Sequence, residues 1–340
     1  MTSLAECLTK QSNDYDFLID EFERRTGLRW DDRINKDFVC GNSVSVIIPA
    51  RNAAYSLRYV LDSLLESKTT AKMEVIIVDD GSTDDTVGIA KSHPLGVKIV
   101  SLPERYGASV ARNIGTVIAH GDTIIYLDAD MVLPDHVIQE HAARTSASMV
   151  GIGFRHNIPY AARSELLNHK PIPPADLERD LRMMWHVRPG HLHYSGIDIK
   201  TAVTVRALEE SNGLRRLGHG SRLLDWDLPR MVVSCLMSAP KAAVISVGGF
   251  EPGFARGWGV EDTHLGAKLI CAGLKVVPFC HAVGFHIDPP DAAEQWKLKL
   301  AAWGVNIEYY KHLLEEPVRA DLSQRLQTDT ERILQTAQTF

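Results

Sequence analysis

The strongest constraint on the fold is an alternation of strands and helices between residues 43 and 130. Short apolar runs are separated by segments in which apolar residues recur at helical spacing, such as residues 54–67 and 109–120. The expected strands are residues 44–48, 75–78, 97–102 and 123–127. Continuous apolar strands that alternate with helices are typical of sheets covered on both faces. The sequence therefore predicts an α/β fold with a mostly parallel central sheet flanked by helices.

The rest of the chain is expected to extend this domain at both ends. Residues 1–42 are predicted as a helical extension and residues 291–340 as C-terminal helices, so the main domain would span residues 43–290. Residues 151–230 are rich in His, Pro and Arg, and we predict irregular structure over the sheet there. A short strand is expected again at residues 275–278.

Charge and composition argue against several classes of protein. The net charge is −6 with both signs mixed along the chain, which argues against nucleic acid as a partner. No apolar run reaches the roughly 18–20 residues that a membrane helix needs, and the N-terminus lacks the pattern of a secretory signal. Five scattered cysteines favour reduced thiols. These features predict a cytoplasmic protein without a transmembrane segment.

Polar segments follow three of the four expected strands. These segments are Ala50–Asn52, the pair Asp79 and Asp80, and Asp128–Asp130. Ligands of open α/β sheets bind beyond the carboxyl ends of the strands, so one site can collect all three segments. Asp79 and Asp80 suit a ribose hydroxyl or a base N–H, and helix capping is the alternative.

Asp128 and Asp130 indicate a metal site at this edge of the sheet. If the chain turns after the strand, both carboxylates can face one cleft, and carboxylate oxygens suit a hard divalent cation. A solvated turn is the alternative. A neutral imidazole from His281 or His286 can complete such a site, although a lone histidine is more often structural.

A second acidic pair, Glu261 and Asp262, follows a glycine-rich segment that contains Trp258. These carboxylates can be simple charges at a helix N-terminus, or they can supply a general base for an acceptor hydroxyl. Trp258 offers a flat apolar surface for a sugar. Arg105 and Arg112 flank Gly107, and either can touch a diphosphate, although Arg112 can instead brace the acidic pair.

The order of these motifs resembles the family 2 glycosyltransferases with the GT-A fold. The first half carries VSVIIPARN at 44–52, VDDGSTD at 78–84, GASVARNIG at 107–115 and LDAD at 127–130. GGF at 248–250 and WGVED at 258–262 resemble the second half of the chondroitin-polymerase-like and polypeptide GalNAc-transferase-like branches. The resemblance covers about residues 43–290. It implies a nucleotide-binding half at 43–135 and an acceptor-binding half at 136–290.

The resemblance implies a divalent cation, Mn²⁺ or Mg²⁺. Asp130 would coordinate it, and Asp128 would lie near the ribose or the cation. His286, or otherwise His281, would be the further ligand. We assign no motif of the family to residues 151–230, and the chain runs into Asp-Pro-Pro after His286, so both the acceptor and the choice of histidine stay open.

The resemblance also implies a nucleotide-sugar donor, with UDP expected, and an inverting direct displacement. Asp262 would take the proton of the acceptor hydroxyl, and Glu261 would hold the acceptor or orient that base. Asp79 would contact the nucleobase. The residues expected to bind the donor are Pro49, Ala50, Arg51, Asn52, Asp79, Gly107, Arg112, Asp128, Ala129 and Trp258.

Two other functions compete with this interpretation. A sugar-1-phosphate nucleotidyltransferase normally opens with a glycine-rich loop after the first strand, but residues 49–53 contain no glycine. A transferase-like protein can also bind nucleotide sugars or glycans without turnover, although the acidic residues and His286 together argue against it. The sequence names neither the sugar, the acceptor nor the linkage, and it leaves a homodimer open.

Overall fold

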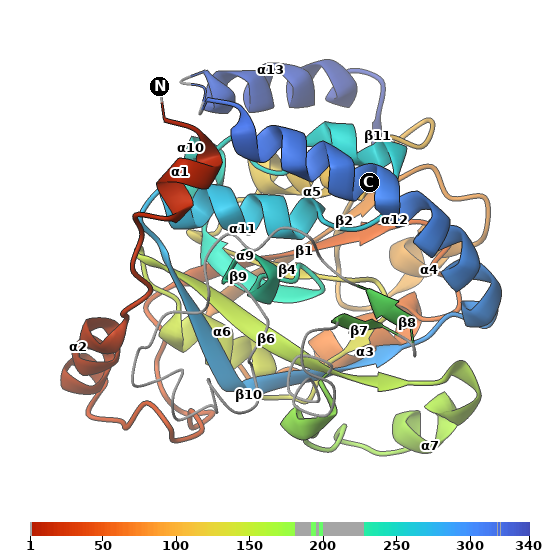
Figure 1. The fold of residues 1–340 in the computed structure, drawn as a ribbon. Coiled ribbons are helices and arrows are strands. Elements are labelled where there is room, and N and C mark those ends of the chain that lie inside the picture. Colours follow the sequence, from red (N-terminus) through yellow and green to blue (C-terminus); the bar gives the residue numbers. More distant parts are fainter. Residues whose placement is uncertain (1, 181–191, 195–196, 200–227, 318, 320) are drawn as a thin grey trace.

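A computed structural model describes residues 2–180, 192–194, 197–199, 228–317, 319 and 321–340 (Figure 1). A nine-stranded sheet with the order β11-β3-β2-β1-β4-β9-β6-β10-β5 forms its centre. β3, β2, β1 and β4 pair in parallel, and so do β6 and β10. β9 lies between these two groups and is antiparallel to both β4 and β6, so the six strands of the two groups run in one direction. The prediction of a mostly parallel central sheet is confirmed.

Five of the six parallel strands contain apolar runs that the sequence predicts as strands, and the set is largely buried because helices cover both faces. The six strands are β1 (Ser43–Ala50), β2 (Lys72–Asp79), β3 (Lys98–Ser101), β4 (Thr123–Leu127), β6 (Met149–Ile158) and β10 (Lys275–Ile287). The opposed strands are β5 (Met131–Val132), β9 (Leu236–Pro240) and β11 (Gln338–Thr339). A separate hairpin pairs β7 (Leu192–Tyr194) with β8 (Ile197–Ile199).

Helices lie on both faces of the sheet (Figure 1). On one face lie α5 (Ala108–Ile118), α10 (Lys241–Ser246), α11 (Glu261–Cys271), α12 (Ala292–Glu315) and α13 (Leu322–Leu334), and on the other lie α3 (Leu57–Leu65) and α6 (Val137–Arg144). The remaining helices are α1 (Leu4–Leu8), α2 (Asp16–Thr26), α4 (Thr86–Ser92), α7 (Arg163–Leu167) and α9 (Leu228–Met231). None of the described helices is long and apolar enough to cross a membrane.

The prediction of irregular structure over residues 151–230 is wrong for the first part of this segment. The first part of this segment belongs to β6, which lies between β9 and β10 inside the sheet. Two glycines hide the strand from a pattern search, and packing requires them: a Cβ at Gly151 would lie 2.2 Å from the Phe279 ring, and one at Gly153 would lie 2.5 Å from Leu236 Cγ. Residues 181–191, 195–196 and 200–227 of this prediction lie outside the described residues.

The last long strand also exceeds its prediction. The expected strand at residues 275–278 continues as β10 to Ile287, with an irregularity between Pro278 and Val283 in its pairing with β6. His281 lies in this irregular part, whereas His286 lies in the regular part opposite β5. The extension of β10 therefore carries only one of the two histidines to the edge where Asp130 lies.

The segment before β1 packs on the main domain. The side chain of Asn13, which is 1% exposed, donates to Val276 O at 2.9 Å and accepts from Val276 N at 2.8 Å. Leu4 and Leu8 of α1 are buried in the common core. The division at residues 42 and 290 stays a prediction.

Candidate active site

The carboxyl ends of the parallel strands open into one cavity of about 450 Å³. Both acidic motifs contribute to it, although about 130 residues of chain separate them. The lining includes Pro49, Ala50, Arg51, Tyr55, Asp80, Gly107, Arg112, Asp128, Ala129, Asp130, Trp258, Glu261 and Asp262. The expectation that one site collects these polar segments agrees with this geometry.

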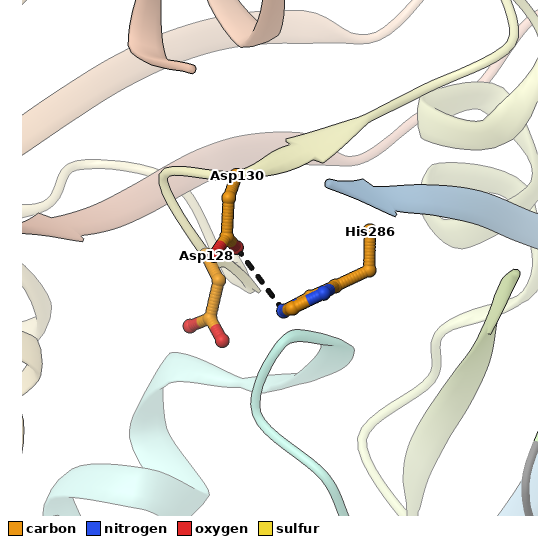
Figure 2. Close-up of side chains that lie close together, drawn as sticks. All are labelled: Asp128, Asp130 and His286. Carbon is orange, nitrogen blue, oxygen red and sulfur yellow. Dashed lines mark ion pairs between the residues drawn. The ribbon is translucent and has the colours of Figure 1, made fainter. Parts of the chain in front are cut away.

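Three potential metal ligands converge at one side of the cavity. Asp128, Asp130 and His286 each offer a ligand atom within 4.8 Å of the others, and Figure 2 shows their side chains turned toward a common space. His286 Nε2 lies 3.3 Å from Asp130 Oδ1. His281 instead lies close to Asp31, with Nε2 at 2.7 Å from its carbonyl oxygen. The structure therefore brings His286, and not His281, to the two aspartates.

A turn after β4 makes this convergence possible. The backbone N–H of Met131 donates to Asp128 O at 3.1 Å, and Ser56 Oγ donates to Ala129 O at 2.8 Å. The chain then leaves as β5, antiparallel to β10 next to His286. Because the strand ends at Leu127, successive side chains no longer alternate strictly between faces, and both carboxylates can face the cavity.

The electrostatics of Asp130 suit a bound cation. Tyr55 donates its hydroxyl to Asp130 Oδ2 at 3.0 Å, while the buried Oδ1 accepts no hydrogen bond and contacts His286 Nε2 only as an ion pair. Burial raises the pKa of this carboxyl, and the charges of His286 and Lys299 oppose that rise. A buried carboxylate oxygen that lacks a donor costs free energy, which a cation can offset.

Arg112 links the metal side of the cavity to the second acidic pair. Its Nη2 lies 2.9 Å from Asp128 Oδ1, its Nη1 lies 3.3 Å from Glu261 Oε1, and its side chain is only 5% exposed. The guanidinium is thus already shared between two carboxylates. Of the two alternatives left by the sequence, this geometry favours bracing the acidic residues over binding a diphosphate.

Glu261 and Asp262 begin helix α11, directly after Val260. Val260 has a φ of +74°, a costly conformation for a β-branched residue, and it turns the chain into the helix. Burial and the charge of Asp262 raise the pKa of Glu261 to about 7, with Arg112 opposing. Burial also raises the pKa of Asp262, which accepts N–H groups of Ser234 at 3.3 Å and Thr263 at 2.8 Å.

Only some of the residues expected to bind the nucleotide-sugar donor line the cavity. Asp79 is 2% exposed and does not line the cavity; its oxygens accept Ser82 N–H at 3.1 Å and Ser101 Oγ–H at 2.8 Å. Asn52 likewise accepts Thr83 N–H at 2.8 Å outside the lining. Asp80 lines the cavity and accepts Gly107 N–H at 2.9 Å. The assigned roles of these residues stay predictions.

Several lining residues carry no signal in the sequence. They come from segments without a motif, and one group lies on α12, which the sequence predicts only as part of an extension. These residues are Tyr55, Arg155, Asp180, Arg230, Lys299 and Trp303. Only the folded chain brings them close to the motifs, so no sequence pattern could have identified them.

Solved structures with a similar fold identify the fold of this chain. A mannosyltransferase of Pyrobaculum calidifontis in complex with GDP-Man and Mn²⁺ has a TM-score of 0.54 at 18% identity, over 98% of this chain and 83% of that one. GalNAc-T7 with UDP, GalNAc and Mn²⁺ has a TM-score of 0.52 at 17% identity, over 85% and 54%. At these identities the likeness shows the fold, and the fold is that of the GT-A glycosyltransferases.

Two family models match parts of the chain. The model described as "Glycosyl transferase family 2" matches residues 45–190, and "N-terminal domain of galactosyltransferase" matches residues 215–288. Residues 215–227 of the second match lie outside the described residues. Residues 45–190 thus match the family 2 glycosyltransferases, as the motif order predicts, and the matches support a glycosyltransferase.

Curated relatives carry the same description. Over 91 residues the chain is 44% identical to the uncharacterized glycosyltransferase YibD of Escherichia coli K12, which covers 26% of each chain. Over 318 residues it is 24% identical to the uncharacterized glycosyltransferase YfnE of Bacillus subtilis 168, which covers 86% of this chain and 79% of the relative. The chain thus matches about a quarter of the first relative and most of the second.

Proposed function

We propose that this chain is a metal-dependent, inverting glycosyltransferase that moves a sugar from a nucleotide-diphosphate donor, with UDP expected, to a hydroxyl group of an acceptor. One observation carries the proposal. A potential metal triad and a separate pair of half-buried carboxylates face the same cavity of about 450 Å³, and Arg112 connects the two. Sugar transfer needs this arrangement, because the leaving diphosphate requires positive charge and the acceptor hydroxyl requires a base.

Asp128, Asp130 and His286 would hold Mn²⁺ or Mg²⁺. Two carboxylates and an imidazole are suitable donors for such a cation, and the buried Oδ1 of Asp130 lacks a hydrogen-bond partner. The cation would supply positive charge for the leaving diphosphate. The solved structures of the mannosyltransferase and of GalNAc-T7 both hold Mn²⁺, which supports the assignment.

Asp262 would take the proton of the acceptor hydroxyl. Its pKa is raised by burial, and a base with a raised pKa is better matched to neutral pH than an ordinary aspartate. Backbone N–H groups of Ser234 and Thr263 hold its orientation. Glu261 would hold the acceptor or orient this base. The acceptor oxygen would attack the anomeric carbon from the side opposite the diphosphate, which inverts the configuration.

The donor side of the cavity would consist of the β1 end and the segment around Gly107. Pro49, Ala50, Arg51 and Gly107 line the cavity next to Asp80. Because the two solved structures hold different nucleotides, GDP-Man and UDP, the fold itself accommodates more than one base. UDP is our proposal for this chain on the motif resemblance alone.

A panel of nucleotide sugars separates the candidate functions. Thermal unfolding is measured with UDP- and GDP-sugars, with and without Mn²⁺, because a ligand that binds only the native state raises its apparent stability. We expect stabilisation by a UDP-sugar only with Mn²⁺, and a slow metal-dependent release of UDP without acceptor. Stabilisation without any release would favour a binding protein. Pyrophosphate release from a nucleoside triphosphate and a sugar 1-phosphate would identify a nucleotidyltransferase.

A further inference from the structure

The C-terminal helix α12 forms one wall of the candidate active site. Lys299, Trp303, Ile307 and Tyr310 of this helix line the cavity. Their helical spacing places them on one face, which lies toward the acidic motifs. Helix α12 is therefore part of the site, and its lining side chains can contact a bound ligand.

Close contacts hold α12 in this position. Asn306 is 1% exposed, and its Nδ2 donates to Phe254 O at 3.0 Å and to Gly259 O at 2.8 Å. A Cβ at Gly257 would lie 2.4 Å from Asn306 Oδ1, so only glycine allows the approach. The helix and the loop that carries Trp258 thus form one fitted unit.

Lys299 brings a positive charge into this cavity. Its Nζ lies 5.4 Å from the ring centroid of Trp258 and 5.9 Å from that of Trp296, contacts that hold an ammonium without cancelling its charge. Among the described residues, no carboxylate forms an ion pair with it. By contrast, Arg112 is bound by Asp128 and Glu261. Lys299 is therefore a cation available to an anionic ligand.

The position of this charge points to the metal side of the cavity. Lys299 lines the same cavity as Asp128 and Asp130, the two carboxylates of the potential metal triad. An anion bound by Asp130's cation would therefore also feel the ammonium of Lys299. The diphosphate of a nucleotide sugar is such an anion, and the charge that it gains as it leaves exceeds what one divalent cation neutralises.

We propose that Lys299 binds the diphosphate of the nucleotide-sugar donor and stabilises the nucleoside diphosphate as it leaves; this inference rests on the proposed function. In the transfer, the bond between the anomeric carbon and the diphosphate oxygen breaks, and its electron pair stays on that oxygen. The acceptor oxygen forms the new bond, and its proton passes to Asp262. The diphosphate gains negative charge, so a fixed ammonium stabilises the leaving group more than the bound donor.

Calorimetric titration of UDP and UMP in the presence of Mn²⁺ tests the proposal. Lys299→Met keeps the length and removes the charge, and we expect it to lower UDP affinity by about 10- to 100-fold, the scale of a charge-assisted contact. UMP lacks the β-phosphate, so its affinity should change much less. Lys299→Arg keeps the charge and should restore most of the UDP affinity.

Lys297→Met is the matched control. Lys297 is exposed on the same helix and does not line the cavity, so this variant should bind UDP and UMP like the wild type. Unchanged UDP affinity in Lys299→Met would overturn the role of Lys299, and so would an equal loss for both nucleotides. Failure of the wild-type chain to bind UDP or GDP with Mn²⁺ would overturn the proposed function itself.

Discussion

Glu74 and Glu261 lie at opposite ends of the parallel strands, and their pKa values are shifted in opposite directions. Glu74 lies in β2 near the amino ends of the strands, whereas Glu261 lies beside the cavity at their carboxyl ends. The pKa of Glu74 is lowered to about 2, and the pKa of Glu261 is raised to about 7. Both side chains are the same, so the difference comes entirely from their surroundings.

Hydrogen bonds explain the low value. Burial by itself would raise the pKa of Glu74, but Ser45 Oγ and the His120 and Gly121 backbone N–H groups donate to its carboxylate and outweigh that effect. The same bonds tie β2 to β1 and to the turn before β4. This carboxylate is satisfied within the protein, and its function is to hold strands together.

Glu261 lacks such a set of donors. Burial and the charge of Asp262 raise its pKa, and Arg112 compensates only in part because it is shared with Asp128. Asp130 shows the same condition, with one buried oxygen that has no hydrogen-bond partner. Glu74 at the amino end of the strands thus stabilises the fold, while the acidic groups around the cavity are left for a ligand to satisfy.

The largest effect is expected from removing a metal ligand at the cavity. Asp130→Ala should abolish the Mn²⁺-dependent part of UDP binding and lower transfer by about 10³-fold, because several kcal/mol of charge stabilisation would be lost. Titration calorimetry with Mn²⁺ and with EDTA checks this. If the variant binds UDP as the wild type does in Mn²⁺, Asp130 does not hold the cation.

A smaller loss is expected at the second acidic pair. Asp262→Asn should leave UDP affinity intact but lower turnover by at least about 10²-fold, the usual scale for losing a general base. Initial rates of UDP release with acceptor present, together with UDP titrations, separate the two effects. Turnover close to that of the wild type would place the base elsewhere.

The high pKa of Glu261 should be visible in the pH profile. Because this carboxyl titrates at about 7, kcat/KM should rise toward pH 7 and level off above it, losing up to about tenfold per pH unit below the inflection. Glu261→Gln cannot titrate, so its profile should lack that inflection. Identical pH profiles for the wild type and Glu261→Gln would contradict a pKa of about 7 for Glu261.

The smallest effect is expected at the amino end, on stability alone. The folded-state pKa of Glu74 lies below its ordinary value of 4.5, so its stabilisation is present above about pH 4.5 and is lost as the pH falls toward 2. Glu74→Gln should lower the free energy of unfolding by about 1–3 kcal/mol at pH 7. Denaturant titrations should show this gap closing between pH 4.5 and pH 2, with UDP binding unchanged. A gap that persists at pH 2 would contradict the role of the ionised carboxylate.

Local pattern was sufficient for the first half of the sheet but not for the second. β1, β2 and β4 are continuous apolar runs that end in polar motifs, and their burial on both faces makes them visible along the chain. β6 carries Gly151 and Gly153, which weaken a strand pattern and are required only because Phe279 and Leu236 pack against them. β10 passes through Pro278 and an irregular pairing before it resumes, so its second part could not be expected from residue type.

The α/β class, the resemblance to family 2 and the identity of the acidic motifs could be read from the sequence, because they depend on residue types at short spacing. The tertiary structure alone decided that His286 rather than His281 meets Asp130, that Arg112 braces two carboxylates, and that α12 brings Lys299 to the cavity. Those choices depend on contacts between segments far apart in the chain. Such contacts arise from packing of the whole core, which no local pattern records.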